Sequence, residues 1–121
     1  MTIEQDRFPP ITVLAGYFDI PVAIRRATWD DHVATRHPEV LSYFDHVVST
    51  IEEPHVISRD RRHPERVYFY RQWPEIVDFP GKWLQVLVLI PRGARRGSVI
   101  SAWAARRIGG KETIWRASDQ S

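Results

Sequence analysis

The spacing of apolar residues changes once along the chain, and this change limits the fold more than any other feature. Between Pro38 and Pro54 the apolar residues recur at intervals of three and four, which is the period of an amphipathic helix. They are Val40, Leu41, Phe44, Val47, Val48 and Ile51. From His55 onward, "RVYFYRQ" alternates and "KWLQVLVLI" is nearly continuous apolar, as strands are. The sequence predicts an α+β fold, with N-terminal helices packed against a curved antiparallel sheet of about four to five strands.

Local signals place the individual elements. Residues 11–20 are predicted to form an opening strand or short hairpin, and residues 29–36 a helix. Pro38 ends that helix, because it disfavours helical geometry at the preceding residue, and it suits the first turn of the next helix. Thr28 with Asp31 resembles a capping box. Further strands are expected at "HVIS" and "GSVISAWAA", with "GGKETIWRAS" adding a turn and an edge strand, while "KWLQVLVLI" is the expected central strand.

Length and composition exclude several classes of protein. A chain of 121 residues, 43% hydrophobic and 26% charged, is predicted to fold as one domain over residues 1–121. It has no cysteine, which excludes a disulfide framework, a thiolate zinc site and a cysteine nucleophile. The N-terminus lacks the apolar run of a signal peptide, and the longest apolar run is too short to span a bilayer. We therefore expect a cytoplasmic protein without a membrane partner.

Charge is distributed unevenly along the chain. Residues 1–58 contain four basic and nine acidic side chains, whereas residues 59–121 contain thirteen basic and six acidic ones. Fifteen of the seventeen basic residues are arginine, which suits bidentate phosphate contacts. This favours a polyanionic partner, although chance and arginine-rich coding would give the same split. Arg92, Arg95 and Arg96 flank a predicted turn, where solvation is the simplest interpretation.

The stretch "WDDHVATRHPE" contains the best candidates for chemistry. His32 and Arg36 are four residues apart, so they share one face of a helix and can reach a common ligand. In a continuous helix His37 would lie about 140° from His32, so the two need not converge. No metal site is expected, because the spacing is not that of a zinc-binding helix. The alternative is that "RHPE" is only a helix boundary; we predict a functional His32 and a structural His37.

The strands offer further candidates. In "RVYFYRQ", alternation places Arg71 on one face and Tyr70 on the other. In "GSVISAWAA", Val99, Ser101 and Trp103 are predicted to share a face, where the hydroxyl and the indole can line a cleft. The alternative is that Ser101 bonds locally and Trp103 belongs to the core. "GGKET" lacks the pattern of a phosphate-binding P-loop.

Five short motifs in order resemble one family of nucleases. They are "W-x-x-H-x-x-x-R-H-P-E", "TIEEPHVISRD", "VYFYR", "KWLQVLV" and "VISAW", and the similarity around them covers roughly residues 18–115. The family is the phage-associated branch of the barnase, EndoU, colicin E5/D and RelE-like nucleases. The resemblance implies a small ribonuclease that needs no metal or cofactor and cleaves RNA by attack of the ribose 2′-hydroxyl on the adjacent phosphate. It also implies a role as a toxin or phage-defence component, with an antitoxin or immunity protein as a possible partner.

The resemblance also implies a set of site residues. The implied catalytic residues are His32, Arg36, Arg71 and Ser101. The candidate substrate-binding residues are His37, Tyr70, Trp103 and Lys111. Serine stands here where threonine is usual, and Trp103 where tyrosine is usual, which matters if a phenol donates a proton.

Cleavage of this kind needs a base with a pKa near 7, a proton donor and cations around the phosphorane. His32 is the expected base, and Arg36 and Arg71 are the expected cations. His37 and Tyr70 remain alternative acids. A non-catalytic RNA- or protein-binding module on the same fold would keep the basic surface but would not need His32.

Overall fold

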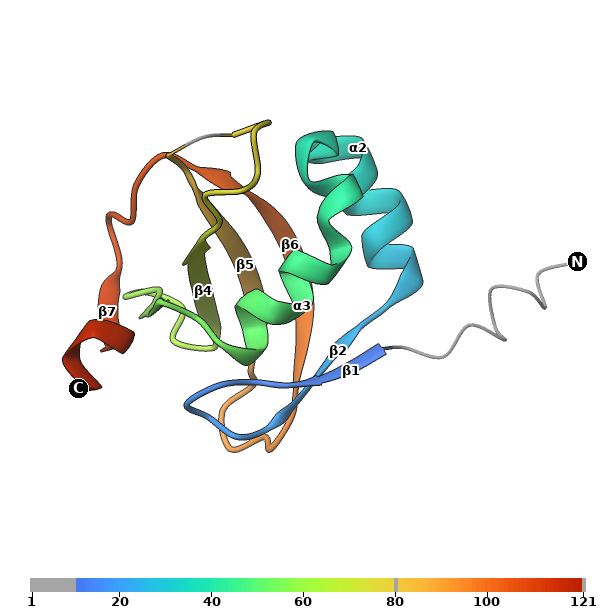
Figure 1. Ribbon diagram of the computed structural model, residues 1–121. Helices are drawn as coiled ribbons and strands as arrows, with labels where there is room; N and C mark the ends of the chain where they lie inside the picture. Colours follow the sequence, from blue (N-terminus) through green and yellow to red (C-terminus); the bar gives the residue numbers. More distant parts are fainter. Residues whose placement is uncertain (1–10, 80, 121) are drawn as a thin grey trace, which may run out of the picture.

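The protein has an α+β fold in which two helices pack on a seven-stranded, mostly antiparallel open sheet (Figure 1). This computed structural model describes residues 11–79 and 81–120. The strands are β1 (Ile11–Leu14), β2 (Pro21–Ile24), β3 (Val56–Arg59), β4 (Arg66–Gln72), β5 (Trp83–Leu89), β6 (Gly97–Ala105) and β7 (Glu112–Arg116). The helical segments are η1 (Thr28–Val33), α2 (Ala34–Arg36), η2 (Pro38–Tyr43), α3 (Phe44–Glu52) and η3 (Ala117–Gln120). Among the described residues, no helix is long and apolar enough to cross a membrane. The N-terminal stretch that lacks a signal-peptide pattern lies outside the described residues.

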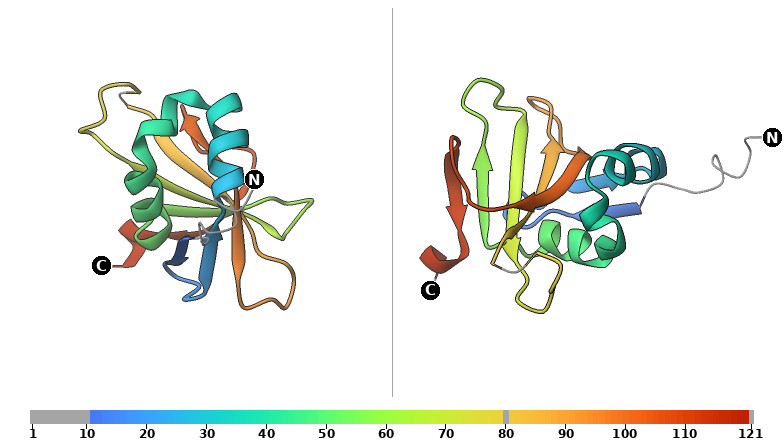
Figure 2. Two further views of the ribbon diagram at one scale, coloured as in Figure 1. Left: turned by 90° about the vertical axis from the view of Figure 1, so that its right-hand side faces the viewer. Right: turned by 90° about the horizontal axis from the view of Figure 1, so that it is seen from above.

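Helices α2 and α3 cover one face of the sheet, and no helix of the described residues covers the opposite face (Figure 2). The central strand β5 has apolar residues on both faces, as its sequence predicts. Leu84, Val86 and Val88 face the helices in the main core. Leu87 faces the other way, which we call the outer face, together with Tyr68 of β4. The sheet is thus sandwiched between the main core and a smaller aromatic cluster.

The sheet is larger than the sequence predicts, because its edges are built from short strands with weak patterns. The order is β1-β2-β6-β5-β4-β3-β7. The opening hairpin exists, but its second strand, β2, lies beyond residues 11–20, in which we expected the hairpin. Strand β2 pairs with β6 in parallel, and only at Val22–Gly97 and Ala23–Ser98. The predicted edge strand β7 pairs with β3, at the edge opposite β1.

The helical region is interrupted at His37, as Pro38 predicts, since His37 has φ −138° and ψ 59°. The first segment differs from the expected regular α-helix. Residues 28–33 wind as a π-helix, and the N–H of Ala34 bonds the carbonyl of Trp29, five residues earlier. The capping-box prediction for Thr28 is wrong: Ala27 occupies the N-cap position and no side chain caps the segment. Such π-turns change which side chains share a face.

Strand β6 contains a bulge that reorients its side chains. Val88 of β5 pairs with Val99, but the next residue, Leu87, pairs with Ser101, so Ile100 is an extra residue. Val99 therefore faces the main core, whereas Ser101 lies on the outer face with Leu87. The prediction that Val99 shares a face with Ser101 and Trp103 is wrong for this reason. A bulge that redirects side chains in this way is common beside functional sites.

The hairpin between β1 and β2 is held close to the end of α3, and this contact yields a test of the fold. The N–H of Gly16 bonds the Ile51 carbonyl at 2.9 Å. A β-carbon at Gly16 would lie 2.5 Å from the carbonyl oxygen of Glu52. We expect Gly16→Ala to lower the free energy of unfolding by about 1–3 kcal/mol in urea denaturation, as overpacking does. The control is Gly109→Ala, where an added β-carbon meets no atom within 4 Å; an equal loss in both variants would contradict the account.

Candidate functional site

A cleft of about 690 Å³ opens on the outer face, along the edge of β6. Its volume falls in the range of ligand-binding sites. The helical segments η1 and α2 form one wall, and strands β4, β5 and β6 form the floor. The lining residues are His32, Arg36, His37, Arg66, Leu87, Leu89, Ile100, Ser101 and Trp103. Five residues that were candidates from the sequence therefore meet in one place.

The central contact of the cleft joins helix to strand. Nε2 of His32 lies 3.1 Å from the hydroxyl oxygen of Ser101, at hydrogen-bond distance, although 69 positions separate them in the chain. Val33, next to His32, is fully buried and anchors the segment in the main core. Ser101 thus bonds across the cleft, and the alternative in which it bonds only locally does not hold.

His37, for which we predicted a structural role at the helix boundary, also lines the cleft. Its ring stacks on Trp103 with centroids 5.3 Å apart and lies 6.1 Å from the ring of His32. The two histidines converge because the π-turn and the break at His37 remove the regular 100° step on which we relied. Burial lowers the pKa of His37, and the nearby Glu39 opposes that effect in part. Its ring is therefore mostly neutral at pH 7.

Two exposed arginines place positive charge at the cleft. Arg36 comes from α2, as predicted, and Arg66 from the first position of β4. We did not single out Arg66 from the sequence. The alternation of side chains along β4 could have identified it, because Arg66 precedes Tyr68 and Tyr70 at a spacing of two and so lies on the same face of the sheet. The cleft thus combines two imidazoles, a hydroxyl and two guanidinium groups.

Arg71 does not join this cleft, although the resemblance implied a catalytic role. The alternation of β4 places it on the helix-covered face with Phe69, as we predicted for the strand. Its guanidinium donates a hydrogen bond to the carbonyl of Glu53 at 2.8 Å and lies 4.2 Å from the centre of the Trp73 ring. The structure therefore places Arg71 at the C-terminal end of α3, on the far side of the sheet from His32 and Ser101.

Tyr70 and Lys111 also lie outside the cleft. The connection from β6 to β7 carries Ile108 onto the aromatic cluster of the outer face, and Tyr70 in that cluster is 0% exposed. Burial raises its pKa, so Tyr70 neither stacks a base nor releases a proton in this structure. The ammonium of Lys111 lies 4.5 Å from the centre of the Tyr68 ring and bonds the Gly109 carbonyl. Of the two aromatic residues, Tyr70 and Trp103, that were candidates for substrate binding, only Trp103 lines the cleft.

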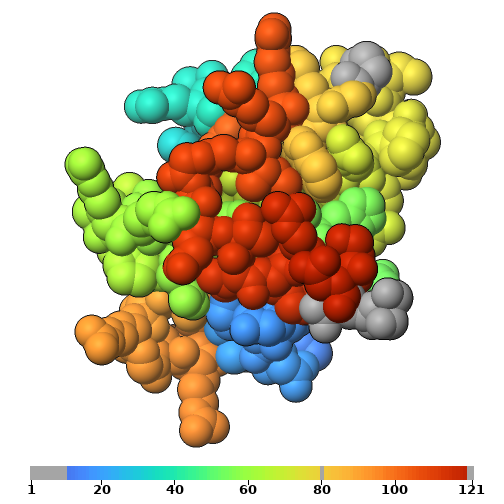
Figure 3. Space-filling view, turned by 90° about the vertical axis from the view of Figure 1, so that its left-hand side faces the viewer, coloured from blue at the N-terminus to red at the C-terminus, as the bar shows by residue number. Residues whose placement is uncertain are grey.

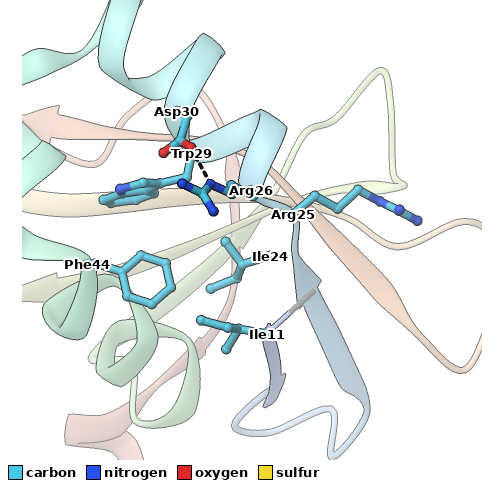
Figure 4. Close-up of a pocket in the computed structure, with 7 residues that line it drawn as sticks. All are labelled: Ile11, Ile24, Arg25, Arg26, Trp29, Asp30 and Phe44. Carbon is cyan, nitrogen blue, oxygen red and sulfur yellow. Dashed lines mark hydrogen bonds and ion pairs between the residues drawn. The ribbon is translucent and has the colours of Figure 1, made fainter. Parts of the chain in front are cut away.

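A second hollow, of about 370 Å³, lies between the β1–β2 hairpin and the helices (Figure 4). Ile11, Ile24 and Phe44 face into it, and it contains no histidine. The Arg26 guanidinium pairs with Asp30 at 2.8 Å, whereas Arg25 extends away from the apolar residues (Figure 4). The carboxylate that lines this hollow, that of Asp30, is already paired with Arg26.

Comparisons of the chain with protein-family models, curated proteins and solved structures found no match. Within residues 11–79 and 81–120 there is no group of three or more acidic or histidine side chains placed to hold a metal ion.

The environment of His37 predicts how stability depends on pH. Because its pKa in the folded state is lowered from the usual 6.5, the unfolded chain binds a proton first as the pH falls. The free energy of unfolding should decrease below about pH 6.5 and continue to fall until the folded-state pKa is passed. His37→Gln should flatten this dependence, leaving the part due to His55, whose pKa burial also lowers. An NMR titration that placed the pKa of His37 above 6.5 would contradict this account.

Proposed function

We propose that this chain is a metal-independent endoribonuclease, and that its fold is of the barnase and RelE-like type. The observation that carries the proposal is the meeting of His32, Ser101 and His37 beside two arginines in one open cleft. Cleavage of RNA through its own 2′-hydroxyl needs two proton transfers and positive charge around the phosphate, and it needs nothing else from the protein. These residues supply each of those requirements.

The two histidines divide the proton transfers in the proposed reaction. His37 is mostly neutral at pH 7, so it is suited to take the proton from the 2′-hydroxyl. The 2′-oxygen then bonds to phosphorus, and the bond to the 5′-oxygen breaks. His32 donates the proton that the leaving 5′-oxygen requires, and the Ser101 hydroxyl holds its ring in position. This assignment revises our expectation that His32 is the base, because burial of His37 favours its neutral form.

The remaining lining residues hold the substrate. Arg36 and Arg66 stabilise the charge that develops on the phosphorane, because guanidinium forks match phosphate oxygens. Trp103 offers an indole face on which a base can stack, although His37 occupies part of it. An antitoxin or immunity protein, which the resemblance leads us to expect, would act most simply by covering this cleft.

The direct test is incubation of the purified protein with total RNA in EDTA. We expect fragments that end in 2′,3′-cyclic phosphate, and a loss of about 10²–10⁴-fold in kcat for His32→Ala and for His37→Ala. His63→Ala is the matched control, because His63 lies in an exposed turn away from the cleft. Cleavage that is equal in all four proteins would contradict the proposal. RNA binding without any cleavage would favour the non-catalytic binding module.

The position of Arg66 in the lining of the cleft gives a second test. We expect Arg66→Gln to lower kcat/KM by about 10–100-fold, because it removes a donor to the phosphorane. Arg62→Gln removes the same charge from the neighbouring turn, outside the lining of the cleft, and serves as the control. If Arg62→Gln had the larger effect, positive charge in general and not the position of Arg66 would account for activity.

A further inference from the structure

A groove of about 620 Å³ continues the cleft along the outer face toward the β5–β6 turn. Leu89 lines both the cleft and the groove, so the two hollows are contiguous. The groove runs across β1, β2, β6 and the end of β5. Its lining residues are Thr12, Pro21, Ala23, Arg25, Leu89, Pro91, Ala94, Arg96, Gly97 and Ser98.

Two arginines, Arg25 and Arg96, give this groove positive charge. Arg25 follows β2, and its side chain extends away from the apolar hollow (Figure 4), while Arg96 precedes β6. Both are exposed, and no carboxylate of the described residues pairs with either. Their charges are therefore available to a ligand. The β5–β6 turn, in orange, and the β3–β4 turn, in yellow-green, project on one side of the molecule (Figure 3).

The rest of the lining indicates what kind of ligand fits. As far as the described residues go, the groove is lined by small and aliphatic side chains, with neither an aromatic ring nor a carboxylate. Without an aromatic ring it offers no platform for a base, whereas two guanidinium forks suit phosphate groups. A third hollow beyond Pro91 contains Arg59 and Arg92 but also Glu65, which would repel a phosphate.

We infer that the groove formed by Arg25 and Arg96 binds the phosphodiester backbone of single-stranded RNA that flanks the nucleotides in the cleft. The inference rests on the proposed function for its substrate class. Binding there is independent of base sequence, because the contacts go to phosphates. With these contacts, the protein binds a longer RNA strand and not only the dinucleotide in the cleft.

The experiment measures binding separately from cleavage. A labelled RNA of about twelve nucleotides is titrated with the His32→Ala protein over a range of salt concentrations, with fluorescence anisotropy as the readout. Adding Arg25→Gln and Arg96→Gln should reduce the slope of log affinity against log salt by about 1.4, since each phosphate contact contributes about 0.7 for single strands. In the protein with both histidines, the same pair should lower the ratio of kcat/KM for this RNA over that for a dinucleotide by about tenfold.

The matched control carries Arg95→Gln and Arg107→Gln, which remove two exposed charges that line none of these hollows. The inference is overturned if this pair reduces the salt slope as much as the groove pair, or if the groove pair changes nothing. If the wild type cleaves RNA but the Arg25→Gln and Arg96→Gln pair leaves the salt slope unchanged, RNA binding in the groove is rejected and the proposed nuclease activity is not. If the wild type does not cleave RNA but this pair reduces the salt slope, RNA binding in the groove is supported and the nuclease activity is rejected.

Discussion

The site depends on the part of the β6 edge beyond Ser98, against which no strand of the described residues pairs. Strand β2 pairs with β6 only as far as Ser98, and beyond that point the described structure places helical segments, not a strand, against this edge. The Glu39 carboxylate accepts a hydrogen bond from the N–H of Ala104 at 3.4 Å, which partly satisfies the open edge. Because the helical wall must lie against β6, His32 is brought to Ser101. A longer β2 would close the edge and remove the cleft.

Two local irregularities then direct the side chains into the cleft. The bulge at Ile100 turns Ser101 to the outer face, and the π-turn before Ala34 lets His32 and His37 point to the same place. Regular versions of either element would separate these groups. Irregular backbone of both kinds is frequent at functional sites, because it positions side chains that regular periods cannot bring together.

These irregularities also explain what the sequence could and could not predict. Continuous apolar character identified β5 as the central strand, and Pro38 located the break between the helices. Strand β2, between β1 and β6, was missed because a four-residue strand carries little periodic signal. The meeting of the two histidines was missed because a 100° rotation per residue was assumed throughout. Arg71 was assigned to the site from a motif, although the alternation of side chains along β4 already placed it on the face opposite Tyr70.

The proposed reaction requires that the imidazoles of His32 and His37 act on the same phosphate group. This requirement can be tested by NMR titration of the histidine rings with and without a 2′-deoxy oligonucleotide, which binds but lacks the attacking hydroxyl. A phosphate placed between the rings would raise the pKa of His37, because an adjacent anion favours its charged form, and it would shift the ring resonances of His32 but not those of His63. An unchanged pKa of His37 and unchanged ring resonances of His32 in the presence of bound oligonucleotide would contradict the account.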